Sequence, residues 1–521
     1  MPILSESNKL QDDTMPQQLP HTTLYTAAQV RKLDRIAIEE KAIAGIQLMK
    51  RAGRAVFNTL IARWPIPTKV TVLCGVGNNA GDGYIVAALA AQRRLPVEVI
   101  QVGEANKLKG DALTAYQYAL QQQVPMSPWG GHLHCSEGLL VDALLGTGLQ
   151  GEVRSPFAYA IEAMNQSNLP ILSVDIPSGL CADTGRILGS AVRADVTVTL
   201  IGRKRGLFTA RAAECCGELM FDQLQVPVDI YNKVGLGVEL LQWQNLLTYM
   251  PIRHADAHKG DFGHVMVIGG DVGYGGAAIM AAETAARLGA GLVSLATRPE
   301  HVTAMLGRRP EVMTTGVTSG QALESILQTP TVLVIGPGLG RSSWSEQMLQ
   351  QAVKSGLPLV MDADALNLLS EGRVINDICR ESWLITPHPG EAARLLGCSV
   401  AKVQTDRFAA VTALQAKFGG TVVLKGSGSL VASASEQGSS EAVRIGLCAD
   451  GNSGMASGGM GDVLSGILGA LLAQRLSCQE AAQLGVCLHA VAADLAVADS
   501  GQRGLLATDL IPYLRELINQ D

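Results

Sequence analysis

The sequence predicts a protein of the α/β class, in which two parallel β-sheets are each covered by helices. Two series of short apolar segments of strand length run along the chain, and segments with helical spacing lie between several of them. Nearly every strand of the second series ends in Gly, Asp or His, as expected where a ligand binds beyond the strand ends. The composition agrees, because 47% hydrophobic residues, 57 glycines and only 4% aromatic residues are typical of α/β units with tight turns.

The first series of elements begins with a helix, expected from Tyr25 to about Asn58. Its apolar residues recur on one face at Val30, Leu33, Ile36 and Ala37. The strands expected after it are 69–75, 97–102, 139–143, 170–175 and 195–200. Because the first of these strands leads directly into the loop GNNAGDG, this half opens like a nucleotide-binding α/β unit.

The second series follows the polar segment 254–263. Its expected strands are 264–270, 291–297, 331–338, 358–364, 382–388 and 421–428. Their polar carboxyl ends predict one long crevice, because ligands in open α/β sheets lie beyond that edge. The most apolar run, 463–473, is too short to cross a bilayer and is expected to be a buried helix.

The length of 521 residues predicts more than one domain, since a single ordinary core does not grow to that size. We expect a flexible tail at 1–23, one domain at 24–240 and a second at 241–521, with a linker around 225–250. The first residues are polar and include acids, so they resemble neither a signal peptide nor an Arg-rich transit peptide. A cytoplasmic protein without a membrane partner is therefore expected.

Charge and cysteine usage exclude two further classes of function. The formal net charge is −6, and there is no basic stripe interleaved with aromatic residues, so no nucleic-acid partner is expected. The ten cysteines include no C-x-x-C pair and no metal-ligand spacing. They are expected to be buried thiols in a reducing compartment.

The segment NSGMASGGMGDVLSG at 452–466 predicts an anion-binding site. Gly458, Gly459 and Gly461 let the backbone approach a phosphate, and a helix that begins near Asp462 adds the positive end of its dipole. Asp462 is then the neighbouring base. A glycine-rich turn alone is as often an ordinary turn, but the acid directly before an apolar helical pattern favours the functional interpretation.

Three segments of the first half place acids beside small residues at strand ends: GNNAGDG at 77–83, VDALLGTG at 141–148 and VDIPSG at 174–179. A buried acid at a strand end can simply cap the next helix, and for Asp142 this alternative has equal weight. After Asp175, the stiff Pro177 and the hydroxyl of Ser178 favour a functional role.

A hard cation would suit the oxygen atoms of this half. Asn79, Asp142 and Ser178 supply amide, carboxylate and hydroxyl oxygens, without histidine or thiolate. Such a set is typical of hard cations and is compatible with a monovalent ion.

These motifs carry a family resemblance over nearly the whole chain. Residues from about 24 to 235 resemble the NAD(P)H-hydrate epimerase domain through GNN-x-GDG, with Ala80 in the variable position, VDALLGTG and VDIPSG. Residues from about 250 to 521 resemble the ADP/ATP-dependent NAD(P)H-hydrate dehydratases, a ribokinase-like family, through HKGDFG, GGDVGYGGAA, GPGLG, DADALN, TPHPGE, KGSGS and NSGMASGGMGDVLSG. Together the halves resemble the bifunctional NAD(P)H-hydrate repair enzymes of bacteria. The fold implied is a Rossmann-like three-layer domain followed by a ribokinase-like α/β domain.

The resemblance implies a repair cycle for hydrated NADH and NADPH, named NADHX and NADPHX. The first domain would interconvert the R and S epimers of the hydrate. The second would dehydrate the S form at the expense of ADP or ATP with Mg²⁺, by phosphorylating the hydroxyl and eliminating phosphate. Bacterial members usually use ADP, and the resemblance implies a homo-oligomer such as a tetramer or a larger assembly.

In the first domain, the resemblance implies that Asp175 is the acid/base at the nicotinamide. It implies a potassium ion held by Asn79, Asp142 and Ser178. The residues implied to hold the hydrate and its phosphate are Asn78, Asn79, Ala80, Gly81, Asp82, Gly146, Thr147, Gly148, Leu149, Gln150, Gly151, Glu152 and Asp175. The sequence departs from the family at Lys204-Arg205-Gly206, where proline is expected between the lysine and the glycine, and this leaves the role of that loop open.

In the second domain, Asp462 would deprotonate the hydroxyl and the amides of 458–461 would neutralise the transferring phosphoryl charge. A lone histidine is more often a structural donor, but the prolines on both sides of His388 favour contact with the hydrate. The residues implied to bind the hydrate are Gly276, Ala277, Gly338, His388 and Asp462. Those implied to bind the nucleotide are Lys425, Gly426, Ser427, Gly428, Ser429 and Gly461.

Two other functions remain open on the sequence alone. A ribokinase-like kinase of a small hydroxylated metabolite would share Asp462 and the anion site, but would release a stable phosphoester. The first half could instead be a nucleotide-sensing module without catalysis, although the acid at Asp175 argues against this alternative.

Overall fold

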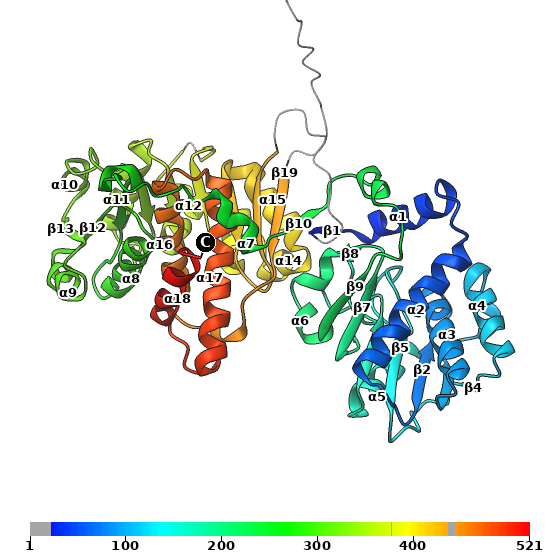
Figure 1. Ribbon diagram of the computed structural model, residues 1–521. Helices are drawn as coiled ribbons and strands as arrows, with labels where there is room; N and C mark the ends of the chain where they lie inside the picture. Colours follow the sequence, from blue (N-terminus) through cyan, green and yellow to red (C-terminus); the bar gives the residue numbers. More distant parts are fainter. Residues whose placement is uncertain (1–21, 377, 436–442, 521) are drawn as a thin grey trace, which may run out of the picture.

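The computed structural model describes residues 22–376, 378–435 and 443–520. Most of the predicted tail, 1–21, lies outside the described residues, whereas Thr23 begins the first strand. Figure 1 shows two halves side by side, each built from a sheet with helices packed on it. The earlier residues, from blue through cyan to blue-green, form one half, and the later residues, from green through yellow to red, form the other.

The N-terminal half contains a sheet in which every pair of neighbouring strands is parallel. In spatial order its strands are β4 (Met126–Pro128), β3 (Val97–Gln101), β2 (Val70–Cys74), β5 (Leu139–Ala143), β6 (Ile171–Val174), β7 (Val196–Leu200) and β9 (Glu218–Asp222). Its helices are α1 (Ala27–Glu39), α2 (Gly45–Arg63), α3 (Asn78–Gln92), α4 (Gly110–Gln121), α5 (Phe157–Gln166) and α6 (Ala212–Cys215). Successive side chains of β2 point to opposite faces of the sheet. Val72 packs in the core that α1 to α4 cover, and Leu73 packs in the core that α5 covers.

The C-terminal half contains the longer sheet. In spatial order its strands are β13 (Met313–Gly316), β12 (Leu292–Thr297), β11 (His264–Ile268), β14 (Val332–Ile335), β15 (Leu359–Met361), β16 (Trp383–Ile385), β17 (Thr421–Leu424), β18 (Ser429–Ala434) and β19 (Val443–Cys448). The seven strands from β13 to β17 are parallel, and β18 and β19 continue the sheet as antiparallel strands. All the strands predicted from the sequence are present, and the α/β class with two sheets is confirmed.

Helices cover both faces of this sheet. One face packs against α8 (Gly275–Arg287), α16 (Met460–Ala473), α17 (Cys478–Ser500) and α18 (Leu510–Leu517). The other packs against α11 (Ser343–Lys354), α12 (Ala363–Glu371), α13 (Pro389–Leu396) and α15 (Arg407–Phe418). Shorter helices are α7 (Trp243–Leu246), α9 (Val302–Arg308), α10 (Gly320–Glu324) and α14 (Val400–Thr405).

The apolar helices are core helices. The run predicted to be a buried helix forms α16, in which every residue from Val463 to Ala473 is buried. Among the described residues, only α17 is long and apolar enough to cross a membrane by length and composition, and 72% of its most apolar window is buried inside the protein. Both helices therefore bury their apolar surfaces inside the protein.

Two local predictions need correction. The helix expected from Tyr25 to about Asn58 is two helices, α1 and α2, separated at residues 40–44. The break falls at Ala42, whose backbone is left-handed with φ of 52° and so cannot continue a right-handed helix. The segment expected to be the loop GNNAGDG is mostly helical, because α3 begins at Asn78. Its amides thus lie at a helix N-terminus.

Strands from the N-terminal part extend the sheet of the C-terminal half. Beyond β19 come β10 (Val238–Leu240), β1 (Thr23–Tyr25) and β8 (Arg203–Lys204). Glu239 is in parallel register with Gly446, and Leu24 pairs with Val238 in the antiparallel sense. The two halves therefore share backbone hydrogen bonding, with β10 drawn between the yellow and blue parts of Figure 1.

Candidate active sites

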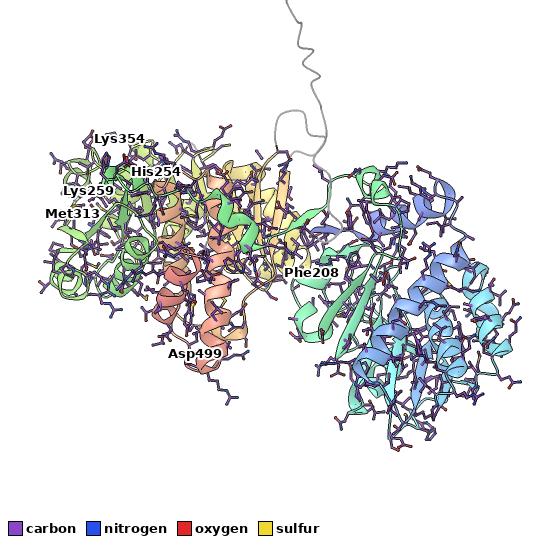
Figure 2. The ribbon with its side chains drawn as sticks, in the orientation of Figure 1. Phe208, His254, Lys259, Met313, Lys354 and Asp499 are labelled. Atoms are coloured by element: carbon purple, nitrogen blue, oxygen red, sulfur yellow. The ribbon has the colours of Figure 1, made fainter. Side chains whose placement is uncertain are left out.

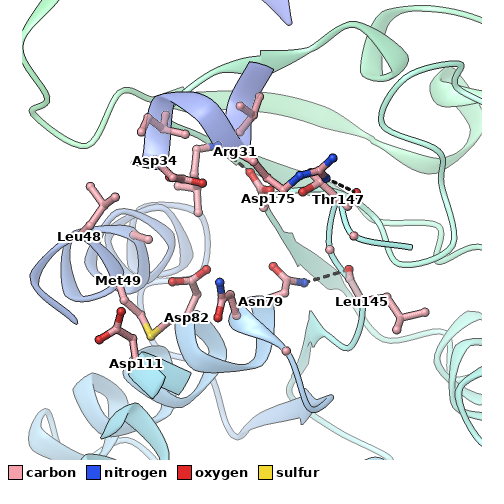
Figure 3. Close-up of a pocket in the computed structure, with 18 of the residues that line it drawn as sticks. Arg31, Asp34, Leu48, Met49, Asn79, Asp82, Asp111, Leu145, Thr147 and Asp175 are labelled. Atoms are coloured by element: carbon pink, nitrogen blue, oxygen red, sulfur yellow. Dashed lines mark hydrogen bonds between the residues drawn. The ribbon is translucent and has the colours of Figure 1, made fainter. Parts of the chain in front are cut away.

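A cavity of about 590 Å³ opens at the carboxyl ends of β2, β5 and β6 in the N-terminal half. This volume lies within the range of small-molecule sites. Residues of α1 and α2 form the opposite wall, as the close-up in Figure 3 shows. Most of the predicted hydrate-binding residues line it: Asn78, Asn79, Asp82, Gly146, Thr147, Gly148, Leu149, Gln150 and Asp175.

Four predicted residues do not line this cavity. Ala80 and Gly81 are buried in α3, and a Cβ added at Gly81 would lie 2.5 Å from the sulfur of Met49. That glycine permits close helix packing. Gly151 and Glu152 are exposed further along the loop.

Four acids line the cavity from different elements: Asp34 from α1, Asp82 from α3, Asp111 from α4 and Asp175 from the end of β6 (Figure 3). Burial, and then the negative charge of Asp175, raise the pKa of Asp34 to about 7. Burial and the same charge raise the pKa of Asp82 well above its ordinary value. The cavity therefore holds one carboxyl group, that of Asp34, that can exchange protons near neutral pH.

Asp175 is paired with a fully buried lysine. Lys204 Nζ donates to Asp175 Oδ1, and it also donates to the hydroxyl of Thr199 and the carbonyl of Leu200. Asp175 has a left-handed backbone with φ of 65°, and its carboxylate accepts from the amide of Leu200. The neighbouring β7 thus fixes the carboxylate of Asp175 at the cavity wall, and the Asp175 side chain remains 18% exposed.

Sequence reasoning missed two residues of this site. It left the role of Lys204 open, although a lysine with 0% side-chain exposure needs an anionic partner. Asp34 went unnoticed because an acid on a surface helix carries no signal of its own. The one unusual feature nearby in the sequence is Arg205, which stands where proline is expected, and it does not indicate the contact with Asp175.

The three predicted cation ligands lie in one hydrogen-bonded cluster. Asp142 is fully buried, and its carboxylate accepts from the backbone and hydroxyl of Ser178 at 2.8 and 2.5 Å. Asn79 Nδ2 and the Ser178 hydroxyl both contact the carbonyl of Leu145, at 3.0 and 3.1 Å. Burial raises the pKa of Asp142, partly offset by the hydrogen bonds of Ser178. The cluster is rich in oxygen atoms, the ligand type that hard cations prefer.

In the C-terminal half, a second cluster of charged groups lies at the strand ends. Asp362 follows β15 and is buried, and its two oxygens accept from Lys425 Nζ at 2.6 Å and from the hydroxyl of Ser465 at 3.0 Å. Lys425 follows β17, and Ser465 lies on α16. A Cβ added at Gly461 would lie 3.1 Å from the Asp362 carboxylate and 3.3 Å from Lys425 Nζ. The first turn of α16 therefore lies directly on this ion pair.

Asp462 lies in that first turn, and its proton affinity is shifted. Burial, and then the charge of Asp362, raise its pKa to about 7. Burial alone would lower the pKa of Lys425, but the charges of Asp362 and Glu391 raise it above its ordinary value. The cluster thus combines a lysine that stays protonated with a carboxylate that titrates near neutrality.

α16 begins at the segment for which the sequence predicts an anion-binding site. Gly459 precedes the helix with φ of 93°, and a Cβ added at Gly458 would meet nothing within 4 Å. The amides of a first helical turn have no intrahelical partner, so they can bind an anion beside Asp462.

His388 has a structural role that the sequence did not reveal. Its Nδ1 accepts from the amides of Gly390 and Glu391 at the start of α13, and the Glu391 carboxylate accepts from its backbone. Burial and the charge of Lys425 lower the pKa of His388, and burial raises that of Glu391 to about 7. The ring is still 50% exposed, so the neutral imidazole caps the helix and also faces the solvent.

The remaining predicted hydrate-binding residues lie together at the start of α8. Gly338 has φ of 58°, and a Cβ there would lie 3.2 Å from that of Ala277 and 2.3 Å from the carbonyl of Tyr274. Gly276 faces open space. These small residues leave room for a ligand beside the backbone at the start of α8 and beside the backbone at Gly338.

The predicted nucleotide loop, 425–429, is held by a buried arginine. Arg407, which is 1% exposed, donates to the carbonyls of Leu424, Lys425 and Gly428 at 3.1 to 3.3 Å. Burial lowers the pKa of Arg407 to about 10. The loop therefore has a fixed backbone, and its first residue, Lys425, belongs to the ion pair with Asp362.

Each half has carboxylates and a lysine clustered at its strand ends, an arrangement typical of an enzyme with two active sites. The sequence profile described as NAD(P)H-hydrate dehydratase matches residues 265–516, and that of the YjeF-related protein N-terminus matches residues 45–206. The chain is 48% identical to a bifunctional NAD(P)H-hydrate repair enzyme Nnr of Coxiella burnetii over 96% of this chain and 100% of that protein. A protein of the same name from Vibrio cholerae is 44% identical, with 98% and 100% coverage. The chain belongs to the family of bifunctional NAD(P)H-hydrate repair enzymes, as its sequence motifs predicted.

A solved structure from Bacillus subtilis is also similar to part of this chain. It is described as an ADP/ATP-dependent NAD(P)H-hydrate dehydratase co-crystallised with ATP and Mg²⁺. It is 24% identical, covers 53% of this chain and 96% of that chain, and has a TM-score of 0.46.

Proposed function

We propose that this chain repairs hydrated NADH and NADPH in two steps, epimerisation in the N-terminal half and ADP- or ATP-dependent dehydration in the C-terminal half. The observation that carries this proposal is the presence of two separate centres. Each contains an aspartate paired with a buried or half-buried lysine at the end of a parallel strand: Asp175 with Lys204, and Asp362 with Lys425.

In the N-terminal centre, Asp175 is the proposed acid/base. Interconversion of two epimers requires a bond at the hydroxyl-bearing carbon to break and form again on the other face. A group that takes and returns a proton beside the ring lowers that barrier. The Lys204 ammonium orients Asp175 and balances its charge, and the helix N-terminus at Asn78 faces the phosphates of the hydrate.

A potassium ion fits the oxygen cluster of Asn79, Asp142 and Ser178 beside the same cavity. Such an ion would supply positive charge near the phosphates of the substrate. Epimerisation is expected to be faster in KCl than in LiCl at matched ionic strength, because a cluster of loop oxygens suits the larger ion. Initial rates with purified R epimer measure this, with dehydration of the S epimer in both salts as the internal control. Equal rates in the two salts would remove the ion from the mechanism.

In the C-terminal centre, Asp462 takes the proton of the substrate hydroxyl as it attacks the terminal phosphoryl group of the nucleotide. The amides of 458–461 and the Lys425 ammonium neutralise the developing charge. Phosphate then leaves the hydroxyl-bearing carbon as the ring nitrogen donates its electron pair. Loss of a proton from the neighbouring ring carbon then restores the double bond of the reduced nicotinamide. The hydroxyl thus departs as phosphate rather than as hydroxide.

Mg²⁺ fits as an ion that arrives with the nucleotide. Among the described residues, no group of three or more His, Cys, Asp or Glu side chains is placed to hold a metal alone. Mg²⁺ commonly binds through one or two carboxylates plus substrate phosphates. Asp364, whose charge contributes to the raised pKa of Asp462, is the proposed carboxylate ligand.

The pH dependence of dehydration follows from the pKa of Asp462. The base must be ionised, so kcat/KM for the S hydrate is expected to fall as pH drops below about 7. Asp362→Asn removes a neighbouring negative charge and so lowers the pKa of Asp462. The acid limb, the fall in kcat/KM at low pH, should then move down by about one pH unit. Rates at saturating ADP between pH 5.5 and 9 measure the limb.

The matched control is Glu391→Gln, because Glu391 is the other carboxyl group here with a pKa of about 7. Glutamine can still accept the backbone amide of His388 and preserve the helix cap. The limb should persist in this variant. Its disappearance would assign the titration to Glu391 instead of Asp462.

The test of the whole function supplies NADH hydrate as an epimer mixture with ADP or ATP. Complete conversion to NADH with release of free phosphate is expected, since both halves are needed to consume both epimers. The kinase alternative predicts that a stable phosphoester of an alcohol accumulates instead. A sensing role for the N-terminal half predicts that conversion stops when the S epimer is exhausted.

We propose a cytoplasmic location as well. All ten cysteines are free thiols, which suits a reducing compartment.

A further inference from the structure

The two halves meet at the proposed nucleotide loop. The segment 204–210, here called the bridging segment, begins at Lys204 of the epimerase centre and continues as a single turn of 3₁₀-helix, Arg205–Phe208. Figure 2 labels Phe208 at the junction of the halves. Phe208 packs against the hydrophobic cores of both halves, so this junction is a packed interface.

Two donors of the bridging segment bind one carbonyl of the loop. The hydroxyl of Thr209 donates to the carbonyl of Ser427 at 3.0 Å, and the amide of Ala210 donates to the same oxygen at 3.2 Å. Thr209 is 1% exposed, so its hydroxyl has no access to bulk water. The orientation of the Ser427 peptide is therefore set from the other half of the chain.

Two further contacts hold the loop from the same side. Gly428 has φ of 65°, and a Cβ added there would lie 2.3 Å from the carbonyl of Phe208, so the two backbones are in close contact. The Arg205 guanidinium lies 4.2 Å from the ring centre of Phe408. Phe408 is adjacent to Arg407, which holds the loop carbonyls. The bridging segment thus contacts the loop directly and also contacts the residue next to Arg407, which holds the loop.

We propose that Thr209 is a positioning residue for the dehydratase nucleotide site, supplied by the epimerase half. This inference rests on the proposed role of residues 425–429 in binding ADP or ATP. A loop with glycines at φ of 141° and 65° has many accessible conformations when it is unsupported. The apparent affinity for nucleotide falls in proportion to the fraction of molecules whose loop has the binding conformation.

The experiment uses the full chain with the Thr209→Val substitution, which preserves shape and removes one donor. The KM for ADP is expected to rise about three- to tenfold, the range of one net hydrogen bond. At saturating ADP, kcat should stay within about twofold, because Asp462 and Lys425 are untouched. Arg205→Met, which removes the contact with Phe408, should raise the same KM. Calorimetric titration with ADP checks binding without catalysis.

The matched control is Thr197→Val. Thr197 is also a fully buried threonine of the N-terminal half that donates to a backbone carbonyl, that of Cys216 at 2.7 Å, but it lies in β7 away from the loop. Similar losses of Tm in Thr197→Val and Thr209→Val, with a raised KM only in the latter, support positioning. A raised KM in both variants would mean general destabilisation and overturn the inference.

Ser427→Asp separates this inference from the nucleotide assignment itself. Ser427 is exposed, and a carboxylate there should repel nucleotide phosphates and raise the KM for ADP. If Ser427→Asp raises the KM while Thr209→Val and Arg205→Met leave it unchanged, the positioning inference is wrong and the nucleotide site stands. If Ser427→Asp has no effect, the loop is not the nucleotide site and both fail.

Discussion

Asp462→Asn is expected to reduce the turnover of S-hydrate dehydration by about 10²- to 10⁴-fold, the usual contribution of a positioned base. Asparagine has nearly the same size as aspartate but cannot accept the hydroxyl proton. The amides of the first turn of α16 and the Lys425 ammonium remain in place, so ADP should bind within about threefold of its normal affinity. Single-turnover rates with ADP and purified S epimer, together with ADP titration, measure the two effects separately.

A matched control is Asp509→Asn, since Asp509 is an exposed acid of the same half that accepts a backbone amide in a short helical turn. This variant should retain full activity. Turnover above about a tenth of the wild-type value in Asp462→Asn would show that Asp462 is not the base. A large loss of ADP affinity in the same variant would place Asp462 in nucleotide binding.

The strands and their ends could be predicted because their signals are local. A short apolar run followed by glycine or aspartate can be recognised from a few residues. Parallel strands bring such ends together at one edge of the sheet. Asp142 and Ser178 illustrate this: the sequence placed Asp142 at a strand end and Ser178 in the turn after the next strand, and they share hydrogen bonds in the structure. Whether that cluster binds an ion stays a prediction.

Partners distant in sequence carried no comparable signal. Lys204 reaches Asp175 from β8, and Asp34 reaches the same cavity from α1. No pattern in the sequence near either residue indicates these contacts. The sheet that joins the halves was missed for the same reason. β1 and β8 have three and two residues, too few for any periodicity to show.

His388 shows that a local signal can carry two meanings. The prolines on both sides indicated a fixed position at the crevice, and the ring does lie half-exposed beside charged groups. The glutamate three residues later is also the mark of a capping box, and the structure contains that box. The capping contact explains the fixed position without a ligand, and contact with the hydrate stays a prediction.

Asp175→Asn is expected to leave an enzyme that dehydrates the S epimer at the normal rate but stalls with the R epimer unconsumed. The acid/base of epimerisation lies in the other half from Asp462, so the two activities separate within one protein. Asparagine can still accept from the amide of Leu200 and from Lys204, so the fold should persist. Spontaneous epimerisation masks a stall over hours, and the assay is therefore read in its first minutes by separating the two epimers.

Lys204→Met tests the same centre from the other side of the ion pair. Methionine fills the buried space of the lysine stem but leaves Asp175 without its cation, so the R epimer should again stall. Normal dehydration of the S epimer serves as the internal control for folding in both variants. If Asp175→Asn clears both epimers at the wild-type rate, Asp175 only fixes the end of its strand. Asp82, whose pKa burial raises in the same cavity, then becomes the candidate acid/base.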